Sequence, residues 1–152
     1  MLARRRLRVV CGDRVRWRKG AGGDAEVIER LARDNALTRP DSRGRTETLA
    51  ANLTAIAVVC SPRPAADLFI IDRYLAAAEQ MAVRGLVVMN KSDLEGAADL
   101  ADRLGAYRPV GYPVLSVSAH DKSGIESLAA ALAGETAILV GQSGVGKSSL
   151  IN

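Results

Sequence analysis

The stretch Gly-Gln-Ser-Gly-Val-Gly-Lys-Ser-Ser-Leu-Ile-Asn, residues 141–152, matches the pattern GxxxxGK[ST] at every fixed position. An apolar run at residues 137–140 precedes it and a helix-forming run follows it, which is the context that this pattern requires. Its glycines let the backbone curl until successive N–H groups converge on phosphate oxygens. The stretch therefore predicts a phosphate-binding loop, or P-loop, between a buried strand and a helix.

Two side chains of this loop have specific expected roles. Lys147 is expected to reach the β- and γ-phosphates of a nucleotide, and the Ser148 hydroxyl is expected to bind Mg²⁺. The alternative interpretation, a glycine-rich turn with a surface lysine, leaves the flanking strand and helix unexplained. The predicted phosphate-binding residues are Gly141, Gln142, Ser143, Gly144, Val145, Gly146, Lys147, Ser148 and Ser149.

A second motif, Asn-Lys-Ser-Asp at residues 90–93, directly follows the apolar run 86–89. The carboxylate of Asp93 can accept from both the ring N–H and the exocyclic amine of guanine, and adenine offers no such donor pair. Asn90 is expected to bond the other edge of the base and to tie neighbouring loops together. The stem of Lys91 can lie along the purine face. The motif favours guanine, although taken alone it would also suit a polar strand-to-helix turn.

The next predicted strand ends in Ser-Val-Ser-Ala-His at residues 116–120. The backbone N–H of Ala119 could donate to the keto oxygen of guanine, which adenine lacks. His120 is expected to be a solvent-exposed loop residue. The predicted guanine-binding residues are Asn90, Lys91, Ser92, Asp93, Ser118 and Ala119.

From residue 53 onward, short apolar runs alternate with stretches of helical spacing. The runs predict buried strands and the stretches predict helices. The predicted strands are 55–60, 86–89, 114–117 and 137–140, and the predicted helices are 69–83, 97–104 and 125–132. Buried strands separated by helices are typical of a parallel sheet with crossover connections. Both motifs follow strand ends, where open α/β sheets bind their ligands.

The front of the chain is predicted to be β-structure. Arg-Val-Arg-Trp-Arg at residues 14–18 alternates, so Val15 and Trp17 are expected to face a core while the arginines project from the other face. Residues 25–31 could form the returning strand. Residues 38–46 are polar, contain Pro and Gly, and are predicted to be a linker.

Positive charge is concentrated at this end of the chain. Lys and Arg greatly outnumber Asp and Glu in residues 1–20, although the net charge of the whole chain is only +4. A basic front on a mildly acidic body is expected to face a polyanion. The candidate contacts are Arg14, Arg16 and Arg18.

The composition argues against a helical membrane protein and against a Cys/His metal site. The chain has 152 residues, of which 48% are hydrophobic and 25% charged, and no apolar run reaches the length of a membrane helix. Cys11 and Cys60 are expected to be buried, reduced thiols. Together with the single histidine they cannot assemble a metal site. We expect a cytoplasmic, monomeric protein.

The motif order identifies a resemblance. A guanine motif, a Ser-Ala loop and then a P-loop is the order found in circularly permuted GTPases, and the chain resembles most closely the bacterial RsgA/YjeQ family of ribosome small-subunit-dependent GTPases. Further residues that carry the resemblance are Gly-Asp-Arg-Val at 12–15, Arg-Asp-Asn-Ala-Leu-Thr-Arg at 33–39, Ala-Asn at 51–52 and Asp-Arg-Tyr-Leu at 72–75. The resemblance covers nearly the whole chain, and the P-loop is its most specific part.

The resemblance implies an N-terminal OB-fold, a Ras-like permuted GTPase domain and a C-terminal zinc-binding domain. It implies hydrolysis of Mg²⁺-bound GTP during late maturation of the small ribosomal subunit, with that subunit and its rRNA as partners. On this basis residues 1–48 are expected to be a partial, RNA-facing OB-fold, and residues 49–152 an incomplete GTPase domain that stops after the P-loop.

The expected remainder of such a protein is missing from the sequence. The switch threonine, the DxxG aspartate, the water-positioning machinery and the zinc ligands are all absent, so no catalytic residue can be named and the chain is expected to be a fragment. Residues 137–140 would then form an exposed apolar edge strand. We expect such a chain to bind GTP weakly and to hydrolyse it very slowly.

Three functions are therefore compared. The first is the GTPase just described. The second is a non-catalytic nucleotide- or RNA-binding remnant. The third is an ATP-dependent P-loop enzyme, which would show no preference for guanine and no dependence of that preference on Asp93.

Overall fold

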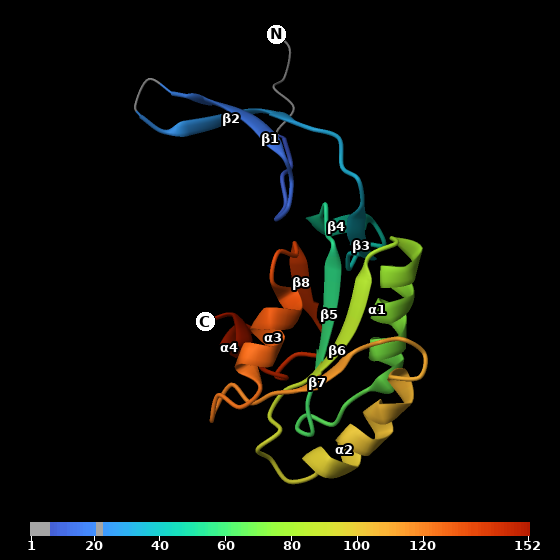
Figure 1. The fold of residues 1–152 in the computed structure, drawn as a ribbon. Helices are drawn as coiled ribbons and strands as arrows, with labels where there is room; N and C mark the ends of the chain where they lie inside the picture. Colours follow the sequence, from blue (N-terminus) through green and yellow to red (C-terminus); the bar gives the residue numbers. More distant parts are fainter. Residues whose placement is uncertain (1–6, 21–22) are drawn as a thin grey trace. The chain divides into compact units, whose positions relative to one another are not determined.

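The computed structural model describes residues 7–20 and 23–152, and it divides the chain into two compact units, Met1–Leu53 and Thr54–Asn152. The first unit holds antiparallel strands, and the second holds a parallel sheet covered by helices (Figure 1). Among the described residues, no helix has the length and apolar character needed to cross a membrane.

The first unit contains two antiparallel hairpins. β1 (Val15–Lys19) pairs with β2 (Ala25–Arg30), and β3 (Ala36–Pro40) pairs with β4 (Thr46–Ala51). Each hairpin has one irregularity in its register, a feature that increases the local twist of a two-stranded ribbon.

The prediction of a linker at residues 38–46 is wrong, because this segment is the tip of the second hairpin. Asp41 closes the turn, since its carboxylate accepts from the backbone N–H groups of Arg43 and Arg45, both at 2.8 Å. Gly44, at a φ of +73°, supplies the left-handed position that the turn requires. Polar residues with Pro and Gly are typical of linkers and of tight turns alike, so composition alone did not separate the two.

The first hairpin has an exposed aromatic side chain. The prediction that Trp17 faces a core is wrong, because its side chain is 62% exposed, and Val15 is only half-buried. Trp17 pairs with Val27 on the neighbouring strand, and the side chain of Val27 is also exposed. The alternating pattern correctly indicated a strand. It could not show whether other residues pack on the face of the ribbon that carries Trp17, and among the described residues none buries it.

The second unit contains the predicted parallel sheet. Its strands are β5 (Ala55–Cys60), β6 (Arg84–Met89), β7 (Val114–Ser116) and β8 (Ala137–Val140), in the spatial order β7-β6-β5-β8. All three pairings are parallel. The helices are α1 (Leu68–Gln80), α2 (Ala97–Leu104), α3 (Ile125–Leu132) and α4 (Lys147–Ile151), with a short 3₁₀ turn at Gly105–Tyr107.

The sheet is sandwiched between helices. In Figure 1, α1 and α2 lie along one side of it and α3 and α4 along the other. Ala57 and Val59 of β5 pack with Leu128 of α3 in one buried cluster that also includes Val145 of the P-loop. Because side chains alternate along a strand, Ile56 and Val58 face the opposite layer, where Ile71, Leu75 and Ala78 of α1 are buried. The core therefore anchors the P-loop directly.

β8 forms one edge of the described sheet. It pairs with β5, and among the described residues it has no strand on its other side. Val140 is buried, whereas the three residues before it are only half-buried. The predicted edge position is therefore confirmed within the described part of the chain.

The two cysteines differ in environment. Cys60 lies at the end of β5 and is buried, as predicted, and burial raises the pKa of its thiol to about 12. Cys11 is exposed, so the prediction of a buried thiol is wrong there. Cys11 lies in a short segment before β1, where it forms an isolated bridge to Ala50.

Candidate nucleotide-binding site

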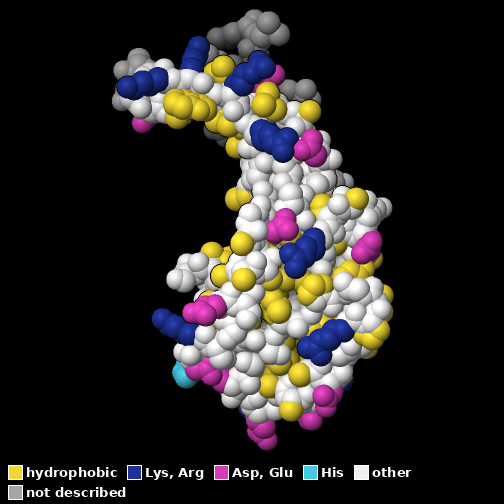
Figure 2. Space-filling model, viewed as in Figure 1, with side chains coloured by type: hydrophobic (Ala, Val, Ile, Leu, Met, Phe, Trp, Pro, Cys, Tyr) yellow, Lys and Arg dark blue, Asp and Glu magenta, His cyan; other side chains and the backbone are white. Residues whose placement is uncertain are grey.

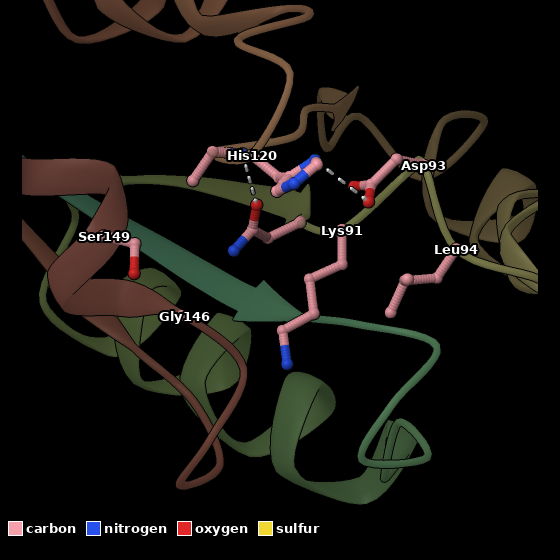
Figure 3. A pocket seen from close by; sticks show the side chains of 8 residues that line it. Lys91, Asp93, Leu94, His120, Gly146 and Ser149 are labelled. Carbon is pink, nitrogen blue, oxygen red and sulfur yellow. Dashed lines mark hydrogen bonds and ion pairs between the residues drawn. The ribbon is translucent and has the colours of Figure 1, made fainter.

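The predicted site residues meet at the carboxyl end of the parallel sheet, after three of its four described strands. The P-loop follows β8, the Asn-Lys-Ser-Asp motif follows β6, and the Ser-Ala loop follows β7. A single cavity of about 400 Å³ lies among these segments, within the size range of small-molecule sites. Its lining residues, drawn in Figure 3, are Asn90, Lys91, Asp93, Leu94, Ala119, His120, Gly146 and Ser149.

Two glycines of the P-loop are required by close packing. A Cβ atom on Gly141 would lie 2.0 Å from the carbonyl oxygen of Val59. A Cβ atom on Gly146 would lie 2.3 Å from Nδ2 of Asn90. Both glycines also have positive φ angles, of +135° and +89°. The P-loop can therefore lie against β5 and the guanine motif only with glycine at these two positions.

Lys147 lies at the start of α4 with its ammonium group turned back over the loop. Its Nζ donates to the carbonyl oxygens of Gly141, at 3.0 Å, and Gln142, at 2.6 Å. The charge is therefore held at the concave side of the P-loop, where the sequence predicts phosphate oxygens. Ser148 and Ser149 follow on the first turn of α4 and are exposed.

Asn90 joins the three segments. Its side chain is buried, at 1% exposure, its Nδ2 donates to the carbonyl oxygen of Val145 at 2.9 Å, and its Oδ1 accepts from the backbone N–H of Ala119 at 3.2 Å. The predicted role of Asn90 in tying neighbouring loops together is therefore confirmed. Its amide fixes the guanine motif against both the P-loop and the Ser-Ala loop.

Asp93 and Ser118 form a fixed pair. The Ser118 hydroxyl donates to Oδ1 of Asp93 at 2.5 Å and is itself fully buried. The same hydroxyl oxygen accepts from the backbone N–H groups of His120 and Asp121. Ser92 donates its backbone N–H to Val117 at 3.1 Å and so keeps the motif on the sheet. The Asp93 carboxylate is therefore oriented before any ligand binds.

Lys91 crosses the cavity. Its Nζ donates to the carbonyl oxygens of Arg63 and Gly144, each at 2.7 Å, so that its aliphatic stem passes beside the space between Asp93 and the P-loop (Figure 3). His120 and Asp93, which also line the cavity, face each other, and Nδ1 of His120 lies 3.9 Å from Oδ2 of Asp93. The side chain of His120 is 87% exposed, as predicted from its loop position.

One element of the site was not predicted from the sequence. The loop after β5, residues 61–67, lies against the P-loop: Gln142 Oε1 accepts from the backbone N–H of Asp67 at 3.2 Å, and Lys91 donates to Arg63. Asp67 in turn caps α1 by accepting from Phe69 N at 3.0 Å. The only sequence signal was Ser-Pro-Arg-Pro, which indicates a turn but not its neighbours.

The donors present fit a magnesium–nucleotide complex better than an isolated metal centre. No group of three or more His, Cys, Asp or Glu side chains in the described part of the chain could hold a metal ion. Mg²⁺ is commonly held by one or two protein oxygens together with phosphates and water. The exposed Ser148 hydroxyl, beside Lys147 at the P-loop, is a suitable single protein ligand of that kind.

The chain was compared with known proteins. The RsgA GTPase family model matches residues 30–152. The chain is 48% identical over 147 residues to the small ribosomal subunit biogenesis GTPase RsgA of Pseudomonas syringae pv. syringae, and 47% identical to that of Azotobacter vinelandii. It also resembles the crystal structure of YjeQ from Thermotoga maritima, with a TM-score of 0.73 and 33% identity over 96% of this chain.

These matches confirm antiparallel hairpins followed by a parallel α/β sheet, as in YjeQ. The two RsgA matches each cover 95% of this chain but 43% of the relative, and the YjeQ match covers 51% of that structure. The chain therefore spans less than half the length of these RsgA relatives. Because the family model matches most of the chain, and the P-loop and guanine motif lie within the matched residues, the chain belongs to the RsgA GTPase family.

Proposed function

We propose that this chain binds guanine nucleotides together with Mg²⁺, and that its biological role is GTP hydrolysis during late maturation of the small ribosomal subunit. The observation that carries the nucleotide site is the Asn90 side chain, which hydrogen-bonds the P-loop and the Ser-Ala loop across one cavity. That link supports a site in which one nucleotide would meet both the Asp93 carboxylate and the P-loop.

The guanine end is argued from Asp93. Its Oδ1 is already held by Ser118, so the carboxylate presents a fixed acceptor edge to the ring N–H and exocyclic amine of guanine. The stem of Lys91 would cover one face of the base. The Ala119 N–H, which donates to Asn90 over a rather long 3.2 Å, could share its hydrogen bond with the keto oxygen.

The phosphate end is argued from Lys147. Its ammonium bonds to two P-loop carbonyls would give way to charge-assisted bonds with phosphate oxygens, which are stronger than bonds to neutral acceptors. Backbone N–H groups of residues 141–149 would complete the contacts. Mg²⁺, bound by Ser148, would neutralise charge on the phosphates.

A second candidate function, a nucleotide- or RNA-binding protein without catalysis, is favoured by one observation. Asp93 is the only acidic residue among those that line the cavity, and it lies at the base end. The P-loop residues among the described lining, Gly146 and Ser149, offer no second carboxylate that could hold Mg²⁺ or orient water. On this ground we propose weak GTP binding and very slow hydrolysis for the chain itself. Turnover equal to that of a full-length relative, stimulated by small ribosomal subunits, would contradict this.

The ribosomal partner is supported by the names of the relatives and by the basic front. The relatives are small ribosomal subunit biogenesis GTPases. Arg14, Arg16 and Arg18 stay candidates for RNA contact, and the structure pairs them with Asp34, Glu29 and Glu26, respectively, at 2.8–2.9 Å. A cytoplasmic location follows from this proposed role.

The substitution Asp93→Asn tests the guanine site. It removes a charged acceptor of two hydrogen bonds, each worth about 1.5–3 kcal/mol, so the affinity for fluorescent GDP should fall by roughly 100-fold or more. The preference for GDP over ADP should be lost. Xanthosine diphosphate, which has a keto oxygen in place of the exocyclic amine, should bind the variant better than GDP does.

The control variant is Asp102→Asn. Asp102 is an exposed residue of α2 and does not line the cavity. Its replacement removes the same charge and should leave GDP affinity within about twofold. Unchanged GDP-over-ADP preference in Asp93→Asn would refute guanine reading by this residue and would favour the ATP-dependent alternative.

A further inference from the structure

The first unit contains a basic hollow that is separate from the nucleotide site. Its volume is about 490 Å³. It lies among the segment before β1, the end of β2 and the start of β4. The residues that line it are Leu7, Arg8, Val9, Val10, Arg30, Arg33, Thr46, Glu47 and Thr48. Figure 2 shows Lys and Arg side chains spaced along this unit, with hydrophobic side chains between them.

Arg33 is the fixed member of the hollow. Its Nε and Nη2 donate to both carboxylate oxygens of Asp13, at 2.6 and 2.8 Å, and its Nη1 donates to Oγ1 of Thr48 at 3.3 Å. The Asp13 side chain is only 1% exposed, and the Arg33 bond is the main reason that the pKa of Asp13 falls to about 2. This buried pair holds the wall of the hollow in place.

Arg8 and Arg30 make no ion pair with a described carboxylate, although Arg30 is close enough to Asp13 to help lower its pKa. Arg30 Nη1 donates only to the backbone carbonyl of Arg8, at 3.3 Å, and neither side chain has an ion pair within the described ranges. Both residues are exposed. The single acidic lining residue, Glu47, already pairs with Arg39 at 3.1 Å. The hollow therefore has an excess of positive charge.

Unlike Arg8 and Arg30, the arginines at and just before β1 all form ion pairs. Arg14, Arg16 and Arg18 each lie beside a carboxylate on the neighbouring strand or loop. Such exposed pairs are individually weak, but each carboxylate cancels most of the local field of its partner. An approaching polyanion would therefore be attracted more strongly to Arg8 and Arg30 than to the alternating arginines of β1.

We infer that the hollow at Arg8, Arg30 and Arg33 binds backbone phosphates of RNA, and that it is the main electrostatic contact of the first unit. The inference rests on the proposed ribosomal partner. Guanidinium groups bind phosphate through two parallel hydrogen bonds, and two unpaired arginines around one concavity suit this geometry. The Thr46 and Thr48 hydroxyls can add neutral donors, which are common in phosphate contacts.

The experiment compares two double variants of equal charge. Binding of the chain to a fluorescently labelled fragment of small-subunit rRNA is measured by anisotropy over a salt series. Arg8→Ser with Arg30→Ser should weaken binding about tenfold or more, and should reduce the slope of log affinity against log salt by roughly two. Arg16→Ser with Arg18→Ser makes the same change in charge at the competing candidate contacts of β1, and if the hollow is the main contact it should change affinity less than threefold.

A conservative variant separates geometry from charge. Arg30→Lys keeps the charge but loses the planar fork, so its affinity should lie between those of the wild type and the serine double variant. Because Arg8 and Arg30 are exposed and make no described ion pair, we expect urea unfolding of all variants to match the wild type.

The outcomes distinguish this inference from the proposed function. Equal weakening by the two double variants would overturn the hollow as the main contact while leaving the ribosomal partner in place. No RNA binding by the wild-type chain, with GDP binding intact, would overturn both the hollow and the proposed ribosomal partner. Loss of binding to phosphatidylglycerol vesicles in the Arg8/Arg30 variant, with RNA binding unchanged, would overturn the RNA assignment in favour of a lipid surface.

Discussion

Replacement of Gly146 by alanine should uncouple the P-loop from the guanine motif. The new Cβ atom would lie 2.3 Å from Nδ2 of Asn90, and the residue would still need a φ of +89°. A left-handed alanine costs about 1–2 kcal/mol, and displacing Asn90 would break its bonds to Val145 and Ala119, each worth about 1 kcal/mol. We expect a loss of about 3–4 kcal/mol in the free energy of unfolding, a large share of the 5–15 kcal/mol typical of a domain.

Two further glycines serve as controls in urea unfolding and GDP titration. Gly144→Ala has the same left-handed strain at a φ of +80°, but its Cβ would meet only Pro64, at 3.7 Å or more, so it should cost about 1–2 kcal/mol. Gly105→Ala adds a Cβ in open space at a helical φ of −53° and should be neutral or slightly stabilising. If Gly146→Ala and Gly144→Ala were indistinguishable in both stability and GDP affinity, the proposed link through Asn90 would be refuted.

The remaining predictions concern the buried side chains of Asp13 and Cys60. The pKa of Asp13 is about 2 in the folded chain against an ordinary 3.8, chiefly through its hydrogen bond with Arg33, so the stability it contributes is complete above pH 4 and is lost as the pH falls towards 2. Urea midpoints measured between pH 5 and 2 should fall more steeply for the wild type than for Asp13→Asn, and parallel curves would contradict this. Because burial raises the pKa of Cys60 to about 12 while Cys11 is exposed, a thiol reagent at pH 8 should label Cys11 rapidly in the native chain and Cys60 only in urea. Rapid labelling of both thiols, or protection of Cys11, would contradict this assignment.

Much of the parallel sheet could be predicted from the sequence because its signals are local. Helices α2 and α3 lie at the predicted residues 97–104 and 125–132, since each has an apolar stripe of helical period. Helix α1 ends at Gln80, earlier than predicted, because Met81 is its C-cap and Ala82 adopts a left-handed φ of +51°. Apolar periodicity continues past such a break, so it could not reveal where the helix stops.

The errors in the front have a common physical cause. Whether Trp17 is buried depends on what packs on its ribbon, and whether residues 38–46 form a linker or a hairpin depends on the pairing of β3 with β4. Both are long-range properties that a period-2 pattern or a Pro/Gly cluster does not encode. The same holds for Arg16 and Arg18, whose glutamate partners became apparent only with the register of the hairpin.

At the nucleotide site, the sequence predicted which residues come together but not how they interact before a ligand binds. The Asn90 amide, the Asp93 carboxylate and the Lys147 ammonium all have protein partners in this structure. Each of these bonds uses one donor or acceptor of a group that has several, so Asp93 retains Oδ2 and Lys147 retains a third proton. A nucleotide would therefore meet an Asp93 carboxylate that is already oriented, which reduces the ordering cost of binding, whereas Lys147 would exchange its carbonyl partners for phosphate oxygens. Substitutions in the supporting contacts, such as Gly146→Ala, should consequently weaken nucleotide affinity even though they remove no ligand-contacting side chain.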